Sequence, residues 1–114
     1  MIVVTHGSRS FDDYSVFLRA MFTSLSMMKQ GDDTFTIYSV GPLRINQMSE
    51  EYINVSNFKA RGIKSRFLMV NEKFVKDNIG SVDYLTYFCN KGEPFSDLIE
   101  FADSVGTENA VYRF

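Results

Sequence analysis

Four residues near the start of the chain, His6-Gly7-Ser8-Arg9, have the side chains and the spacing of an anion-binding turn. They follow the apolar run Ile2-Val3-Val4 and precede Asp12-Asp13-Tyr14, where a helix can begin. A glycine between a strand and a helix lets the backbone approach a ligand, and the free N–H groups of the helix N-terminus attract phosphate. An arginine beside them can form two parallel hydrogen bonds to a phosphate. The segment therefore predicts a phosphate-bearing ligand.

Each of these polar residues also has a structural interpretation. Arg9 can pair with Asp12, with Asp13 or with a nearby carbonyl instead of a ligand, and Ser8 can serve only to tighten the turn. His6 is the only histidine, and no cysteine, serine or carboxylate stands at a spacing that would make it a general acid or base. We therefore expect His6 to be a hydrogen-bonded structural residue at the edge of the site. We predict no catalytic residue and no metal site.

The composition is that of a packed globular domain. Of 114 residues, 45% are hydrophobic and 15% are aromatic. The net charge is −2, so the sequence predicts no broad binding of nucleic acid and no attraction to a membrane surface. Cys89 is the only cysteine, which excludes an internal disulfide and predicts a cytoplasmic protein. No apolar run approaches the roughly 18 residues that a membrane-spanning helix needs.

Strand and helix patterns alternate along the chain, which predicts an α/β domain with a mostly parallel sheet of about five strands. Apolar runs predict strands at 1–5, 35–40, 66–70, 84–89 and 110–114. Helical spacing predicts a helix over 13–29 that Asp12 or Asp13 caps, a second from about 45 to a left-handed cap at Gly62, and a third over 95–105. The predicted apolar faces include Leu18 and Phe22 in the first helix, Val55 and Phe58 in the second, and Phe95, Leu98, Ile99, Ala102 and Val105 in the third. Irregular turns are expected over 71–81.

The chain resembles the small Rossmann-like domains of the SLOG superfamily, in particular a group of unknown function common in phages and bacteria. Members of that group carry a glycine, a small residue, an arginine, an aromatic residue and an Asp-Tyr pair after the first strand. The residues in these places here are Gly7, Ser8, Arg9, Phe11, Asp13 and Tyr14. Residues 82–88, 97–102 and 111–113 resemble the family's last strands and helix, and Lys91-Gly92 resembles its loop. The resemblance implies a Rossmann-like three-layer sandwich over 1–114, a phage or mobile-element origin, and a nucleotide or nucleotide derivative as ligand.

The segment 39–46 departs from the family's second glycine motif, Ser-Gly-Gly-Ala-Arg-Gly-Ala-Asp. Only Ser39 and Gly41 match it, Leu43 replaces the arginine, and Pro42 removes a backbone donor. In a second register the same residues resemble the family's Gly-Pro-Ile-Arg-Asn motif, which follows its third strand. Both registers stay open. In either register Arg44 starts a helix, where a cation is unfavourable unless an anion binds nearby.

The three candidate segments should meet at one edge of the sheet. Ligands of open parallel sheets bind at the carboxyl ends of the strands, so 6–9, 39–44 and 89–93 should converge. The predicted phosphate ligands are Gly7, Ser8, Arg9, Ser39, Gly41 and Arg44, and the predicted lining residues are His6, Lys91 and Gly92.

Two functions are compatible with this site. The first is binding of a phosphate-containing small molecule, a nucleotide or a nucleotide derivative. The second is binding of a partner protein by a degenerate domain that acts as an inhibitor or adaptor. Nucleotide-processing relatives in the superfamily have a Pro-Gly-Gly-x-Gly-Thr loop and a catalytic glutamate, and neither motif occurs here. We therefore do not predict an enzyme.

Overall fold

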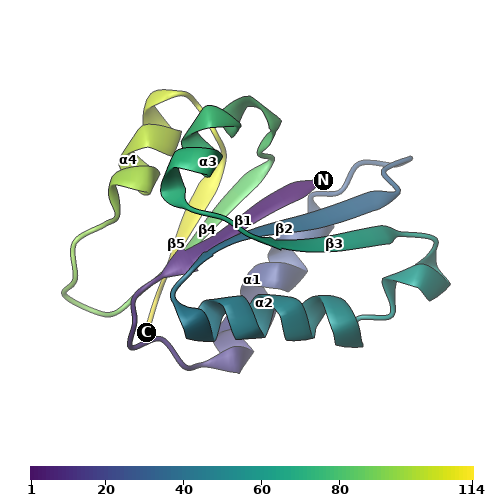
Figure 1. The fold of residues 1–114 in the computed structure, drawn as a ribbon, viewed down its shortest axis with the longest axis horizontal. Coiled ribbons are helices and arrows are strands. Elements are labelled where there is room, and N and C mark those ends of the chain that lie inside the picture. The colour runs from purple at the N-terminus through teal and green to yellow at the C-terminus, as the bar shows by residue number, and fades with distance from the viewer.

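Five parallel strands form the centre of the computed structural model, which describes residues 1–114 (Figure 1). The strands lie in the order β3-β2-β1-β4-β5. Their bounds are β1 Ile2–Gly7, β2 Thr34–Gly41, β3 Lys64–Met69, β4 Tyr84–Cys89 and β5 Asn109–Arg113. All five predicted strands occur, with ends shifted by no more than two residues. The α/β prediction is confirmed, and the sheet is parallel throughout.

Two helices cover each face of the sheet (Figure 1). One face carries α1 (Tyr14–Ser26) and α2 (Leu43–Val55), and the other carries α3 (Glu72–Asp77) and α4 (Asp97–Ser104). Side chains alternate along a strand, so Val3 packs toward α1 and α2 whereas Val4 packs toward α3 and α4. The result is the three-layer arrangement of a Rossmann-like domain. None of the helices combines the length and the apolar character that a membrane span requires.

The second predicted helix is wrong in its length. Helix α2 ends at Val55, which is 66% exposed and does not face the core. Asn57 then adopts a left-handed conformation, and the buried Phe58 begins a separate 3-10 turn, η1 (Phe58–Arg61). Gly62 is left-handed, as predicted, but it ends this turn instead of the helix. The chain thus buries Phe58 through a break in the helix, which helical spacing alone does not reveal.

Two further segments differ from their predicted form. Ser96 caps α4 through a hydrogen bond from Leu98 N–H, so Phe95 lies before the helix and Val105 after it. Both are about half exposed, whereas the predicted core residues Leu98, Ile99 and Ala102 are buried. Residues 71–81 form the short helix α3 and a 3-10 turn, η2 (Ile79–Ser81), rather than irregular turns alone.

Asp13 is the cap of α1, as the sequence predicts. Its carboxylate accepts hydrogen bonds from the N–H groups of Ser15 and Val16 and from the Ser15 hydroxyl. These bonds hold the pKa of Asp13 below its usual value, and the charge of Arg19 adds to the shift. The cap therefore fixes where the turn after β1 ends and the helix begins.

Candidate functional site

The strand order places the expected ligand crevice between β1 and β4. From β1 the chain builds β2 and β3 on one side of the sheet, and it then returns to add β4 and β5 on the other. The loops after β1 and β4, residues 8–13 and 90–96, therefore leave the sheet in opposite directions. Such a switch point is where open parallel sheets bind ligands.

Ser8 closes this crevice with hydrogen bonds from one loop to the other. Its N–H donates to the Phe88 carbonyl over 2.8 Å, and its hydroxyl accepts from Asn90 N–H over 3.1 Å. The same hydroxyl donates to a Glu93 carboxylate oxygen over 2.5 Å. The side chain that was predicted to bind phosphate thus uses its only hydrogen-bond donor within the protein, and its role toward a ligand stays a prediction.

Gly7 is required by packing. Its position on β1 faces α2, and a Cβ atom there would lie 2.5 Å from the Phe88 carbonyl oxygen and 2.7 Å from Ile45 Cδ1. Atoms that close overlap, so only glycine lets β1, β4 and α2 come together at this point. The sequence signal for glycine is real, and its structural cause is close packing within the fold.

His6 lies on the opposite face of β1, between two hydrogen-bond acceptors. Its Nδ1 donates to the Gly41 carbonyl over 2.8 Å, because a carbonyl can only accept. Its Nε2 lies 3.0 Å from a Glu72 carboxylate oxygen, and its ring meets Tyr87 edge-on. His6 therefore ties the end of β2 to the start of α3, which agrees with the predicted structural role.

Two glutamates, Glu72 and Glu93, lie at the crevice between β1 and β4. Burial raises the pKa of Tyr87, and the neighbouring Cys89, Glu93 and Glu72 add to the shift. The phenol therefore keeps its proton, and two of the nearby charged groups are glutamates. A phosphate would meet repulsion here from both carboxylates, so this part of the sheet edge is unfavourable for an anion.

Arg9 and Arg44 lie together in a separate hollow over the ends of β1 and β2. The hollow has a volume of about 580 Å³ and is lined by Arg9, Pro42, Leu43, Arg44 and Gln47. Arg9 is exposed and has no ion pair within the domain. Arg44 makes one exposed ion pair, from its Nε to Asp12 over 2.5 Å. The carboxylate that was a predicted partner of Arg9 thus belongs to Arg44.

The N-terminus of α2 opens beside these two arginines. Pro42 precedes the helix and provides no side-chain hydrogen bond, whereas α1, α3 and α4 are each capped by a side chain. The first turn of α2 contains no acidic residue. Its first N–H groups therefore keep the partial positive charge of a helix N-terminus next to two guanidinium groups.

The remaining predicted residues lie around these two regions. The Ser39 hydroxyl donates to the Asn46 side chain over 2.5 Å and is fully buried, so it braces the turn into α2. Gly41 has a positive φ of 96° at this turn, a conformation that glycine adopts without strain. Lys91 and Gly92 are exposed in the loop after β4 and do not line the arginine hollow.

Comparison with known proteins identifies no relative of this chain. The chain matches no protein-family model, no curated protein and no solved structure. The domain is Rossmann-like. This assignment rests on the strand order, the parallel strand pairing and the helical layer on each face of the sheet. The likeness to the SLOG superfamily stays a resemblance of motifs.

Glu72 was missed by sequence reasoning, whereas Asn90 and Glu93 lie in the predicted segment 89–93. The three residues hold His6 and Ser8 from 66, 82 and 85 positions away in the chain. Glu72 begins α3, and Asn90 and Glu93 lie in the loop after β4, so no local pattern in the sequence pairs them with His6 or Ser8. Their place at the carboxyl ends of β3 and β4 is the one signal that could have pointed to them.

Proposed function

We propose that this domain binds a small phosphate-bearing ligand, a nucleotide or nucleotide derivative, in the hollow of Arg9 and Arg44. The observation that carries the proposal is the pairing of these two arginines with the uncapped N-terminus of α2. Guanidinium groups bind phosphate oxygens through paired hydrogen bonds, and a helix N-terminus adds N–H donors. The phosphate lies against Arg9, Arg44 and the first turn of α2.

The surroundings of the hollow support an anion more than any other ligand. Arg9 has no carboxylate partner, and the single partner of Arg44, Asp12, is on the surface, where exposed pairs contribute little. The volume of about 580 Å³ falls within the range of small-molecule sites. Pro42 and the exposed Leu43 offer an apolar surface on which a base or sugar can rest.

Arg9→Ala tests the proposal. Thermal melting with nucleoside mono-, di- and triphosphates and with inorganic phosphate first selects the ligand, since a ligand at one hundred times its dissociation constant adds about 2.7 kcal/mol of stability. Calorimetric titration of that ligand should then show Arg9→Ala weakened by about 1.5 to 3 kcal/mol, the value of a charged hydrogen bond. The melting temperature of the unliganded variant should stay unchanged.

Arg66→Ala is the matched control, because Arg66 is also exposed and unpaired but lies on β3, outside the hollow. Equal losses of affinity in the two variants would mean that only net charge matters. If no nucleotide and no phosphate raises the melting temperature at millimolar concentration, the domain is not a binder of such ligands.

A second candidate function, binding of a protein, is favoured by a different observation. Leu18 and Phe22 are exposed side by side on α1 and line a groove. This groove is apolar, whereas the arginine hollow is positively charged. A protein could bind this groove without any nucleotide, and such binding can be tested independently of Arg9.

A further inference from the structure

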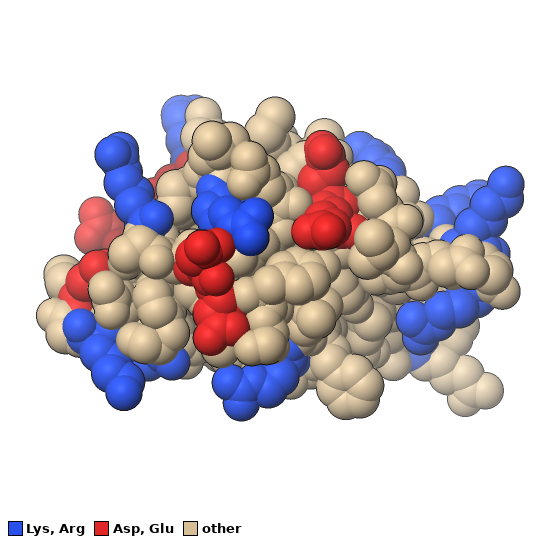
Figure 2. All heavy atoms as spheres, turned by 90° about the horizontal axis from the view of Figure 1, so that it is seen from below, with Lys and Arg blue, Asp and Glu red and all other residues tan.

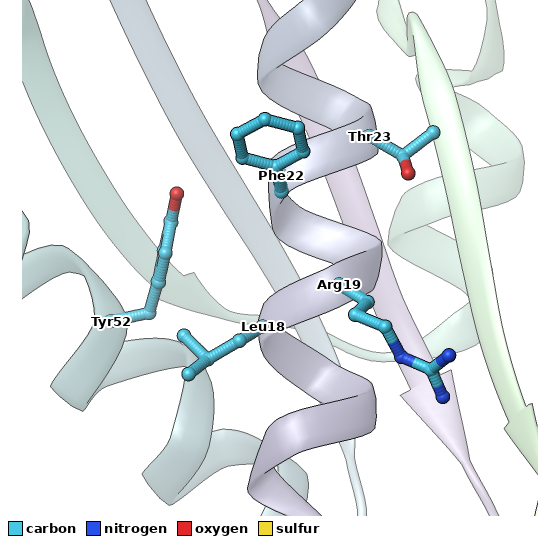
Figure 3. Close-up of a pocket in the computed structure, with 5 residues that line it drawn as sticks. All are labelled: Leu18, Arg19, Phe22, Thr23 and Tyr52. Carbon is cyan, nitrogen blue, oxygen red and sulfur yellow. The ribbon is translucent and has the colours of Figure 1, made fainter.

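An apolar groove runs along the outer side of α1, where that helix faces solvent beside α2. Its lining residues are Leu18, Arg19, Phe22, Thr23 and Tyr52, and its volume is about 560 Å³ (Figure 3). Phe22 is 76% exposed, the largest exposed fraction of any large hydrophobic residue in the domain. Figure 2 shows an area without charged side chains on the face that carries α1 and α2, bordered by both basic and acidic side chains. Exposed apolar surfaces of this kind occur where a protein contacts another molecule.

We propose that this groove is the contact surface of a homodimer, in which a second copy of this chain packs its own α1 against it. A two-fold contact uses the same surface on both copies, so that surface must contain both a projection and a matching hollow. Here Phe22 projects from α1, and Leu18 and Tyr52 form the hollow next to it (Figure 3). Leu18 and Phe22 are four positions apart, which is the spacing of the ridges through which helices interlock.

The charges on the two sides of the groove favour a second copy over an unrelated protein. Arg19 points to the side of α1 away from Tyr52 (Figure 3), and Glu51 lies on the α2 side. Neither residue makes an ion pair within the domain. Arg19 lines the groove, and Glu51 directly precedes the lining residue Tyr52 on α2.

Opposite charges on opposite sides of one surface are complementary to the same surface after a two-fold rotation. An axis parallel to α1 brings Arg19 of one copy toward Glu51 of the second copy, and the reverse pair forms at the same time. The two α1 helices then run parallel, with the Phe22 side chains on either side of the axis. Large aromatic side chains at the centre of such a contact usually contribute most of its stability.

Sedimentation equilibrium of the full chain without nucleotide tests the proposal. The wild type should be a dimer that dissociates on dilution, and Phe22→Glu should raise its dissociation constant at least about tenfold. Val105→Glu is the control, because Val105 is 50% exposed next to α4 on the other face of the sheet. It introduces the same charge and should leave the dissociation constant unchanged.

A charge exchange tests the orientation of the two copies. Arg19→Glu and Glu51→Arg should each raise the dissociation constant about threefold, the effect of an exposed ion pair. The double variant should return to the wild-type value, because the exchanged charges again face each other. Circular dichroism should show all variants folded.

Three results would overturn the proposal. The wild type could stay monomeric up to millimolar concentration, Val105→Glu could weaken association as much as Phe22→Glu, or the double exchange could fail to restore it. A monomer whose Phe22→Glu variant loses contact with a different, purified protein would assign the groove to that protein instead. None of these results depends on Arg9 or on a nucleotide, so the proposed function stands or fails separately.

Discussion

The crevice between β1 and β4 and the arginine hollow beside it are built from neighbouring residues of one motif, yet they differ in almost every property. In the crevice, Gly7 is packed against other elements, and the Ser8 hydroxyl donates to Glu93 and accepts from Asn90 N–H. The surrounding charges are those of glutamates. In the hollow, one residue further along, Arg9 is exposed and unpaired.

This difference shows that neighbouring residues of one strand-glycine-helix turn can have different functions. The residues that lie on or next to the strand must satisfy the packing and hydrogen bonding of the sheet edge, so they have little freedom to meet a ligand. The next residue, Arg9, lies on the surface and is free to contact a ligand. Within the domain, Gly7 and Ser8 are engaged by packing and hydrogen bonds whereas Arg9 is exposed, and the ligand role of all three stays a prediction.

The largest effect should come from Gly7→Ala. The added Cβ atom would lie 2.5 Å from the Phe88 carbonyl oxygen, a backbone atom that cannot move without disturbing β4. Overpacking of this kind should lower the free energy of unfolding by about 3 kcal/mol. Urea denaturation measures it. Gly80→Ala is the control, because nothing lies within 4 Å of its Cβ position and its φ is not positive.

A different result for Gly7→Ala would mean that the crevice and the arginine hollow form one binding site. If Gly7→Ala keeps its stability and instead loses affinity for the nucleotide selected by thermal melting, Gly7 serves the ligand directly. The crevice would then belong to the binding site together with Arg9.

Ser8→Ala should have a smaller effect, and on stability alone. The variant loses the bonds to Asn90 N–H and to Glu93, and it leaves the half-buried N–H without an acceptor. We expect a loss of about 1 to 2 kcal/mol in the free energy of unfolding. Ser10→Ala, which removes only an exposed bond to the Asn90 side chain, should cost about 0.5 kcal/mol or less. A Ser8→Ala variant of normal stability but reduced nucleotide affinity would contradict this division of tasks.

Local signals in the sequence were enough to predict the architecture. Strands such as Tyr84–Cys89 are nearly continuous apolar runs, interrupted here only by Thr86, because both faces of the sheet are covered, and all six residues of this strand are buried. The cap at Asp13 follows from one side chain and two backbone N–H groups within three positions. Interactions of this range depend on neighbours in the chain, which the sequence displays directly.

The contents of the site could not be predicted in the same way. Helical spacing placed Leu18 and Phe22 on the apolar stripe of α1, but the sheet receives only one side of that helix and leaves both residues exposed. His6 was left without a partner by sequence reasoning, because Glu72 reaches it only after β2, α2 and β3 have been put in place. Pairing over such separations is decided by the tertiary fold, and a single sequence carries no pattern for it.

The smallest expected effect concerns the pH dependence of stability and distinguishes two adjacent carboxylates. Asp13 caps α1, whereas Asp12 pairs with Arg44 at the hollow. Asp13 has a folded pKa below its usual value, so it contributes stability above the unfolded pKa of about 4, and this contribution is lost as the pH falls through the folded pKa. Asp13→Asn keeps a capping oxygen but does not titrate. The urea midpoint of the wild type should therefore fall more than that of Asp13→Asn between about pH 5 and pH 3.

Asp12→Asn is the natural counterpart, because its carboxylate pairs with Arg44 and caps nothing. At neutral pH this variant should bind the selected nucleotide up to about threefold more tightly, since Arg44 loses an exposed competitor for the phosphate. Asp13→Asn should leave that affinity unchanged. Should the two substitutions exchange their effects, with Asp13→Asn altering affinity and Asp12→Asn flattening the acid transition, then Asp13 would belong to the ligand hollow and Asp12 to the structural turn, contrary to the contacts of Arg44 and the cap of α1.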